Sequence, residues 1–325
     1  MKYEGMIYRP PSEAQSLILQ VAVGCSYNRC TFCHSFRDRE FRIKSFEEVR
    51  EDIDEAGRSG AFPRVFLADG DALVVPQADL VRILDYLKLK IRGLERVGIY
   101  ANAVDVLKKE PHELEALRER GLGIVYLGLE TGNPEILRRI RKNATAQQMI
   151  RAAARVHAAG MLLSVTVLLG IGGVEMSRAH AEDTGRVLSE MDPDFVGALS
   201  LMVVPGTPIA EELRSGALVL PTPFELIREL ETMITHCRFT RCFFASNHAS
   251  NYLPLRIRMP EAPQPIPRPP APLPGHLKRH RSSPVKGSPT QTEPSSPKAA
   301  ATCGTPSVSV TAGEIARATT SVPFG

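Results

Sequence analysis

Three of the six cysteines in this 325-residue chain fall within nine residues. They are Cys25, Cys30 and Cys33, in the stretch Gly-Cys-Ser-Tyr-Asn-Arg-Cys-Thr-Phe-Cys, and they directly follow an apolar run over residues 17–23. Three thiolates on one short loop can bind one metal centre and leave one coordination position without a protein ligand. Because an added ligand reacts at such an open position, the spacing predicts a metal centre with a chemical role.

The cysteine loop allows three interpretations. Structural cysteines are small core residues, and three of them rarely cluster on a polar loop. A zinc site completed by His34, or by Cys237 and Cys242, stays open as an alternative, although zinc ligands usually come as two closely spaced pairs and this second pair has a four-residue gap. The third interpretation is an iron–sulfur cluster. A [4Fe–4S] cube normally takes four thiolates, so three leave one iron free for an external ligand, and Phe32 would shield the cluster.

Composition and charge restrict the class of protein. Hydrophobic residues make up 43% of the chain, enough for a sizeable core. Residues 1–16 do not resemble a secretory signal, and no apolar run reaches the roughly 18 residues that span a bilayer. We therefore expect a cytoplasmic protein, in which clustered cysteines favour a metal over a disulfide. The net charge of +4 lies in residues 260–325, so the core has no overall basic excess that would suggest nucleic acid.

Six short apolar runs predict buried strands at residues 17–23, 64–68, 97–101, 123–129, 162–169 and 195–201. Helical patterns lie between them and begin at Ser45, Asn133, Thr145, Thr207 and Thr222, each of which is a typical N-cap. Strands that alternate with helices predict an α/β fold with parallel strands. Six such units form either a doubly wound sheet or a partly closed barrel. Both architectures place their active site at the carboxyl ends of the strands.

The chain divides into three predicted regions: an N-terminal extension at 1–16, a core domain at 17–255 and a basic tail at 256–325. From residue 260 onward the chain holds 14 of its 26 prolines and few large apolar residues, so we expect a disordered, proline-rich tail. Composition leaves two interpretations of the tail open, a partner-binding arm and an extension without function.

The cysteine loop resembles that of the radical S-adenosylmethionine (SAM) enzymes, in which clustered cysteines follow the first strand and an aromatic residue precedes the third cysteine. The usual gaps in that family are three residues and then two, whereas this chain has four and then two. Together with Phe-Arg-Ile-Lys at residues 41–44, the loop closely resembles a group of small, mostly uncharacterised radical SAM proteins with the longer gap. The resemblance covers residues 5–255. It implies a partial (βα)6 barrel of the TIM type with a [4Fe–4S] cluster and SAM at its mouth.

The resemblance also implies contacts to SAM after the second and fourth strands. Asp69, Gly70 and Asp71 match the position of a Gly-Gly-Glu-like segment that receives the SAM amino group, although Asp-Gly is also a common turn. Glu130 ends the fourth strand at a position where relatives have a polar residue that contacts SAM. Lys142 lies where a cation pairs with the SAM carboxylate in relatives, although a solvated helix face explains it as well.

Three later segments complete the implied site. Gly170 begins a glycine-rich turn after the fifth strand, which lies beside the adenine in relatives. Pro205 follows the sixth strand in a segment that relatives carry near the adenosine, although a tight turn into a helix explains it equally well. His248 lies in Ser-Asn-His-Ala-Ser-Asn-Tyr, which resembles a C-terminal signature of the same small group. His248 is a candidate acid, base or hydrogen-bond donor toward the substrate, and a loop that closes the barrel is the alternative.

The activity implied by the resemblance is reductive cleavage of SAM to methionine and a 5′-deoxyadenosyl radical, which abstracts hydrogen from an unknown substrate. A flavodoxin or ferredoxin is the expected electron donor, and no membrane partner is expected. An iron–sulfur protein for electron transfer or sensing, without SAM turnover, is the first alternative. A zinc-stabilised binding scaffold is the second. The six predicted strands with polar residues at their ends favour the enzyme, because an electron carrier needs no barrel.

Overall fold

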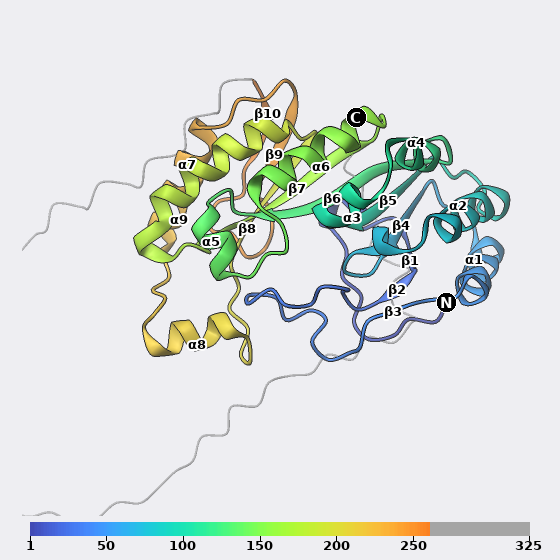
Figure 1. Cartoon of the computed structure of the whole chain (residues 1–325), viewed down its shortest axis with the longest axis horizontal. Helices are drawn as coiled ribbons and strands as arrows, with labels where there is room; N and C mark the ends of the chain where they lie inside the picture. Colours follow the sequence, from blue (N-terminus) through green and yellow to red (C-terminus); the bar gives the residue numbers. More distant parts are fainter. Residues whose placement is uncertain (261–325) are drawn as a thin grey trace, which may run out of the picture. The chain divides into compact units, whose positions relative to one another are not determined.

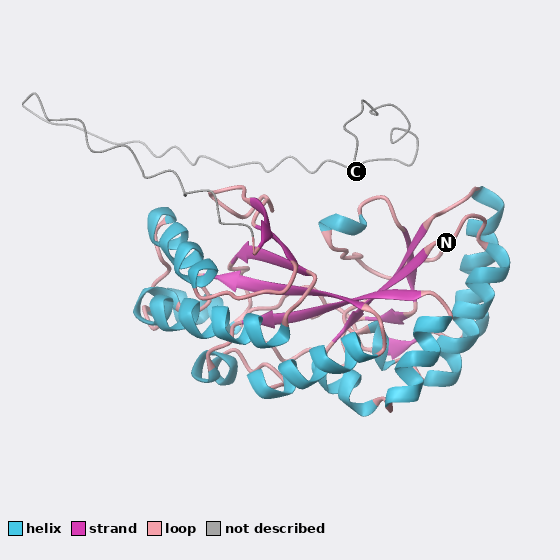
Figure 2. Cartoon of the chain, turned by 90° about the horizontal axis from the view of Figure 1, so that it is seen from above, coloured by secondary structure: helices cyan, strands magenta, loops and turns pink. Residues whose placement is uncertain are grey.

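The computed structural model describes residues 1–260, and these residues form one curved sheet with helices along one face (Figures 1 and 2). The sheet has eight strands in the order β1 (Leu17–Gln20), β4 (Arg64–Ala68), β5 (Arg96–Ala101), β6 (Leu122–Glu130), β7 (Leu162–Leu169), β8 (Phe195–Ser200), β9 (Cys242–Ala245) and β10 (Arg256–Met259). All neighbours are parallel except β9 and β10.

The strand order decides between the two predicted architectures. Among the eight strands of this sheet, each lies beside the one that precedes it in sequence, so the sheet grows in one direction from β1 to β10. A doubly wound sheet would reverse its direction at a switch point. The arrangement is therefore the predicted partial barrel, whose two edges are β1 and β10 within the described part of the chain.

The helices begin where their capping residues predict. Ser45, Thr145 and Thr222 each form a capping box, and the amide oxygen of Asn133 accepts from the first turn of its helix. Thr207 differs, because its hydroxyl donates to the carbonyl of Val204 instead of capping the helix. The helices are α1 (Phe46–Ser59), α2 (Gln77–Lys90), α3 (Ala103–Lys108), α4 (Pro111–Glu119), α5 (Pro134–Arg139), α6 (Ala146–Ala158), α7 (Gly173–Met191), α8 (Pro208–Ser215) and α9 (Pro223–Thr235).

Side chains alternate between the two faces of the sheet. On the outer face, Leu19 and Leu67 are fully buried in the main core, which the helices complete. On the inner face, Phe66, Tyr100 and Tyr126 meet edge to face, with ring centroids 4.8, 5.5 and 6.2 Å apart. These rings fill part of the barrel interior and support the strands beneath their carboxyl ends.

The 3-10 helix η1 (Pro11–Glu13) contacts the sheet near the amino end of β5. Glu13 is fully buried, and its Oε1 accepts hydrogen bonds from the Tyr126 hydroxyl at 2.6 Å and the Arg96 guanidinium at 2.8 Å. Arg96 is the first residue of β5, so this contact lies opposite to the carboxyl ends. The predicted N-terminal extension is therefore hydrogen-bonded to the strands β5 and β6.

The six predicted strands are confirmed, with boundary differences. The run at 17–23 divides into β1 and β2 (Ala22–Val23), and β2 pairs antiparallel with β3 (Arg42–Ile43). Strands β9 and β10 were not predicted. Strand β10 lies inside the range 256–325 predicted as tail, so a tail that begins at residue 256 is wrong. The rest of the predicted tail, from residue 261, lies outside the described residues.

Candidate functional site

The three cysteines lie on the loop that joins β2 to β3, beside the carboxyl end of β1. Cys25, Cys30 and Cys33 are all partly exposed. Between the first two, Asn28 has a φ of 41°, in the left-handed region that asparagine adopts more readily than most residues. Its side-chain amide donates to the carbonyl of Phe36 at 2.7 Å. The loop therefore turns back on itself within the four-residue gap.

The segment from Cys30 to Cys33 is held on both sides. Arg37 donates to the carbonyls of Cys33 and Cys30, each at 2.8 Å. Phe32 packs against a small apolar cluster built from other parts of the barrel. The buried members of this cluster are Ile136, Ile140, Ile171, Ile209 and Leu218. Phe32 therefore anchors the loop to the helical side of the mouth.

The loop is also hydrogen-bonded to the end of α5. The Tyr27 hydroxyl donates to the carbonyl of Arg141 at 2.8 Å, and the Thr31 amide donates to the carbonyl of Ile140 at 3.0 Å. The Thr31 carbonyl in turn accepts from the Ile209 amide in the first turn of α8 at 3.3 Å. These contacts fix the loop between two helices that follow β6 and β8.

The segment after β4 holds the first half of the cysteine loop. Asp69 Oδ2 accepts from the Gly24 amide at 3.1 Å, whereas its Oδ1 is buried without a hydrogen-bond partner. Burial raises the pKa of this carboxyl. Gly70 faces Cys25 so closely that an added Cβ would lie 2.7 Å from the cysteine Cβ. Asp71 accepts from the amide and the hydroxyl of Ser26.

Glu130 and Lys142 form an ion pair at the carboxyl end of β6. The Lys142 ammonium lies 2.8 Å from Glu130 Oε1, and both side chains are only about one tenth exposed, at 11% and 10%. Burial lowers the pKa of Lys142, but the charges of Glu130 and Cys30 outweigh burial and leave it raised. Lys142 is therefore charged and within electrostatic range of the cysteine loop. Glu130 has a φ of 64°, and the added Cβ of an alanine at Gly128 would meet its carboxylate.

The chemistry of the three thiols fits a [4Fe–4S] cluster. Burial raises the pKa of Cys30 to about 11; Lys142 works against this effect, and the nearby Cys33 and Cys25 add to it. Within residues 1–260, no three His, Cys, Asp or Glu side chains converge as ligands of a single ion. The thiolates of a cube bind separate irons, and metal binding would replace the thiol protons.

A buried polar network lies beside the glycine-rich turn after β7. The Gly170 amide, at a φ of 80°, donates to Glu229 Oε1 at 2.6 Å, and the Ser177 hydroxyl donates to Glu229 Oε2. Burial raises the pKa of Glu229 to about 7. His180 Nε2 lies 3.5 Å from Glu229, and its Nδ1 lies 2.8 Å from the Thr131 hydroxyl. The network thus connects the ends of β6 and β7 to α7 and α9.

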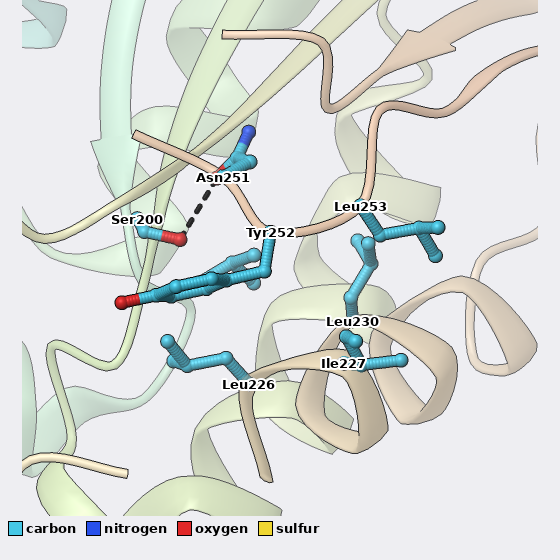
Figure 3. Close-up of a pocket in the computed structure, with 8 residues that line it drawn as sticks. Ser200, Leu226, Ile227, Leu230, Asn251, Tyr252 and Leu253 are labelled. Carbon is cyan, nitrogen blue, oxygen red and sulfur yellow. Dashed lines mark hydrogen bonds between the residues drawn. The ribbon is translucent and has the colours of Figure 1, made fainter. Parts of the chain in front are cut away.

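The residues 246–252 form a loop that covers the end of β8. Asn251 accepts from the Ser200 hydroxyl at 2.8 Å and donates to the carbonyl of Ala198 at 2.7 Å. His248 Nδ1 lies 2.8 Å from the Ser250 hydroxyl. A small pocket lies between this loop and α9 (Figure 3). Its lining residues are Leu169, Ser200, Leu226, Ile227, Leu230, Asn251, Tyr252 and Leu253.

The structure brings some of the predicted site residues together. The segment 69–71 contacts the cysteine loop directly, and Lys142 lies within its electrostatic range. Gly170 is part of the polar network with Glu229, and Pro205 lies on an exposed turn before α8. The ring of His248 is hydrogen-bonded within its own loop.

Sequence reasoning missed several residues that support the site. Asn102, directly after β5, donates to Asp71 at 3.0 Å and caps α3. A polar residue at the end of a buried strand drew attention to the ends of other strands, and the same signal could have identified Asn102. Gln20 donates to Asp69 at 3.2 Å, and Arg39 lies 3.9 Å from the same carboxylate.

A sequence model of the radical SAM superfamily matches residues 19–183, just over half of the chain. The barrel topology and the cysteine loop agree with this match, and the chain belongs to the radical SAM superfamily. Enzymes of this superfamily bind a [4Fe–4S] cluster and SAM. The match includes the cysteines and the strand ends that carry Asp69, Glu130 and Gly170.

Two curated relatives show how far the sequence similarity extends. The chain is 26% identical over 201 residues to 4′-phospho-dehydrooxetanocin synthase of Priestia megaterium, a match that covers 54% of this chain and 27% of the synthase. It is 23% identical over 225 residues to an uncharacterized methyltransferase of Pyrococcus horikoshii, which covers 69% of this chain and 47% of the relative. The chain thus spans less than half the length of either relative.

Solved structures agree in fold. Coproporphyrinogen III oxidase (HemN) from Escherichia coli, described as a radical SAM enzyme, superposes with a TM-score of 0.54 at 15% identity, covering 68% of this chain and 51% of that one. The radical SAM methyltransferase TsrM from Kitasatospora setae, solved with cobalamin and a [4Fe–4S] cluster, gives 0.50 at 16% identity, covering 62% and 39%. No helix within residues 1–260 is long and apolar enough to cross a membrane.

Proposed function

We propose that this chain is a radical SAM enzyme that cleaves SAM reductively and uses the resulting radical on a substrate that the chain does not identify. The observation that carries the proposal is the cysteine loop at the carboxyl ends of the strands, with a buried carboxylate and a buried lysine ammonium beside it. The relatives of this chain include proteins named for different activities, a synthase and an uncharacterized methyltransferase. We place the enzyme in the cytoplasm and expect a flavodoxin or ferredoxin as its reductant.

Different residues of the chain would hold the cluster and SAM. Cys25, Cys30 and Cys33 would bind three irons of the cluster, and SAM would bind the fourth. When bound, the reduced cluster supplies one electron that cleaves a carbon–sulfur bond of SAM, which yields methionine and a 5′-deoxyadenosyl radical that abstracts hydrogen from the substrate. The chain's own groups bind, orient and shield these partners.

Two carboxylates after β4 take different parts. Asp69 Oδ1 is buried without a partner, and a cationic amino group would satisfy it, so we assign the SAM amino group to this residue. Both oxygens of Asp71 already accept from Ser26 and Asn102, so Asp71 positions the cysteine loop. Gly70 leaves the space that Cys25 needs. Lys142 is the candidate partner of the SAM carboxylate, with Glu130 holding its ammonium group in place.

The segments beyond β6 are assigned to the adenosine and the substrate. Gly170 fixes its turn through Glu229, which leaves the backbone at the end of β7 in a defined position beside the proposed adenine site. Pro205 is assigned to the adenosine side of the mouth. His248 stays a candidate acid or base whose ring nitrogen Nδ1 is hydrogen-bonded to Ser250.

Anaerobic reconstitution followed by incubation with SAM and dithionite tests the proposal. The expected result is a cluster-bearing protein that forms 5′-deoxyadenosine and methionine in equal amounts. The matched control is Cys237→Ala, which removes a buried thiol from a site remote from the loop in sequence and should leave both products. A protein that holds the cluster, binds SAM and yields no 5′-deoxyadenosine would be an electron carrier or sensor, and the enzyme proposal would fail.

A further inference from the structure

We infer that an acidic one-electron carrier protein of the flavodoxin type docks on a rim of exposed arginines around the cysteine loop. The arginine rim consists of Arg29, Arg37, Arg138 and Arg141, all of which are exposed. This inference rests on the proposed function, because it names the partner that would deliver the electron to the same site. It concerns exposed arginines beside the loop, whereas the proposed SAM contacts, Asp69 and Lys142, are buried or nearly so.

Contacts between two segments place the rim around the loop. Arg37 donates to the backbone of Cys30 and Cys33, so its guanidinium lies directly against the cysteine segment. Tyr27 donates to the carbonyl of Arg141, which brings the end of α5 beside the loop.

Arg29 and Arg138 complete the rim through their positions in the chain. Arg29 lies between Tyr27 and Thr31, both of which are bonded to the end of α5. The Arg141 amide donates to the carbonyl of Arg138 at 3.0 Å, so these two arginines belong to the same turn.

The charge of the rim is not neutralised by its surroundings. None of the four arginines has a carboxylate within 4.0 Å among residues 1–260. Asp38, the acidic residue next to Arg37, pairs with Arg39. Residues 24–41 and 134–142 together carry seven Lys or Arg and three Asp or Glu, whereas residues 1–259 as a whole are neutral. The basic excess is therefore concentrated at the loop.

A localised basic rim fits a protein electron donor better than a nucleic acid. Steering by a small patch brings an acidic protein into a defined orientation and raises its association rate. Nucleic acid binding would call for a basic excess spread over a longer face, which the neutral core does not show. The donor also has to come close to the cluster, and the rim surrounds the segment that would bind it. In the transfer itself the donor's flavin loses one electron and the cluster gains it, with no other group consumed.

The test compares two double variants with the same change in charge. Arg29→Glu/Arg138→Glu reverses two rim charges and leaves Arg37, which contacts the cysteine backbone, in place. Arg58→Glu/Arg92→Glu is the control. Arg58 lies in the last turn of α1, as Arg138 does in α5, and both control residues are exposed and precede strands, at the opposite end of the barrel.

Two readouts are used, neither of which needs SAM cleavage. The first is the rate at which reduced flavodoxin bleaches the visible absorption of the reconstituted cluster. The second is the affinity of flavodoxin for the cluster-free protein. At low salt the rate of cluster reduction and the affinity for flavodoxin should both fall roughly tenfold or more in the rim variant. Both values should stay within about twofold of wild type in the control variant. Added salt should narrow the difference between the rim variant and wild type.

The possible outcomes separate the two proposals. Equal rates in the rim variant and wild type, or equal losses in both variants, would overturn the docking site. Rim-dependent binding of a single-stranded RNA oligonucleotide, with unchanged flavodoxin reduction, would overturn it in favour of a nucleic-acid surface. If the rim variant does not fold, Arg29→Gln/Arg138→Gln replaces it. This variant removes the two charges without reversing them, so its losses of reduction rate and of affinity should be about half as large on a logarithmic scale. Failure of wild type to form 5′-deoxyadenosine with dithionite would instead defeat the proposed function.

Discussion

Replacing Glu229 by glutamine is expected to remove a pH dependence of folding stability that the wild-type chain carries. Glu229 is 2% exposed on α9, and it accepts one hydrogen bond from the Gly170 amide and one from the Ser177 hydroxyl. Burial raises its pKa to about 7 although both hydrogen bonds favour the charged form. Glutamine has nearly the same shape and keeps an oxygen for Gly170, but it does not titrate.

The size of the expected pH effect follows from the difference in the pKa of Glu229 between the folded and the unfolded chain. The unfolded carboxyl titrates near 4.5 and the folded one near 7. Below pH 4.5 both states are protonated. As the pH rises toward 7 the unfolded chain loses its proton first, which favours unfolding. At about 1.4 kcal/mol per pKa unit, wild type should therefore lose about 2–3 kcal/mol relative to Glu229→Gln between about pH 5 and about pH 8.

Urea unfolding of both proteins at a series of pH values measures this difference. Burial lowers the pKa of His180 to about 4, so this residue makes the fold less stable as the pH falls below the ordinary histidine pKa. Because His180 is present in both proteins, its effect largely cancels in the comparison. Glu190→Gln, at an exposed position of α7, is the matched control and should change neither the stability nor its pH dependence. A stability difference between Glu229→Gln and wild type that stays constant with pH would refute the buried, protonated state of Glu229.

Two further predictions concern the strand ends. Lys142→Met should destabilise the fold by about 3 kcal/mol or more in urea unfolding, because it leaves Glu130 nearly buried without a partner, and Lys142→Met/Glu130→Leu should recover most of that loss; a single variant as stable as wild type would contradict the pair. Gly70→Ala should lower the iron bound after reconstitution, because its Cβ would press on Cys25, whereas Gly60→Ala, with open space around it, should bind iron normally. Equal iron in both glycine variants would show that the loop tolerates displacement.

The strands and caps of the barrel follow from sequence because local rules act there. Short apolar runs bounded by turn signals are typical of buried strands, so their positions predict β4 to β8 closely. Ser45 and Thr222 cap helices through contacts three residues away. Strand β9 was not predicted because its apolar run is only four residues long, and β10 because its two arginines leave little apolar signal.

The site could be predicted only where polar residues directly follow a strand. The family resemblance singles out Asp69, Asp71 and Glu130 at such strand ends, and Asn102 lies at another strand end. The partner of Gly170 could not be found, because Glu229 lies on an amphipathic helix where a carboxylate usually faces solvent. Only tertiary packing shows that this one is buried.

The accommodation of the extra loop residue is likewise a tertiary property. Spacing alone cannot show whether a four-residue gap still presents Cys25 together with Cys30 and Cys33. The structure adds that Asn28, within this gap, has a left-handed conformation and donates a hydrogen bond to Phe36. Asparagine adopts the left-handed conformation more readily than most residues. The sequence does not show that position 28 needs this conformation, because the need appears only once the turn is known.

The central claim is that Cys25, Cys30 and Cys33 carry a cluster that cleaves SAM, and one paired measurement tests it most directly. Iron content and 5′-deoxyadenosine yield are measured together for reconstituted wild type, Cys25→Ala and Cys237→Ala with SAM and dithionite. We predict about four irons per chain and product from wild type and Cys237→Ala, and loss of both from Cys25→Ala. A Cys25→Ala protein that keeps a full cluster and forms product would contradict the account.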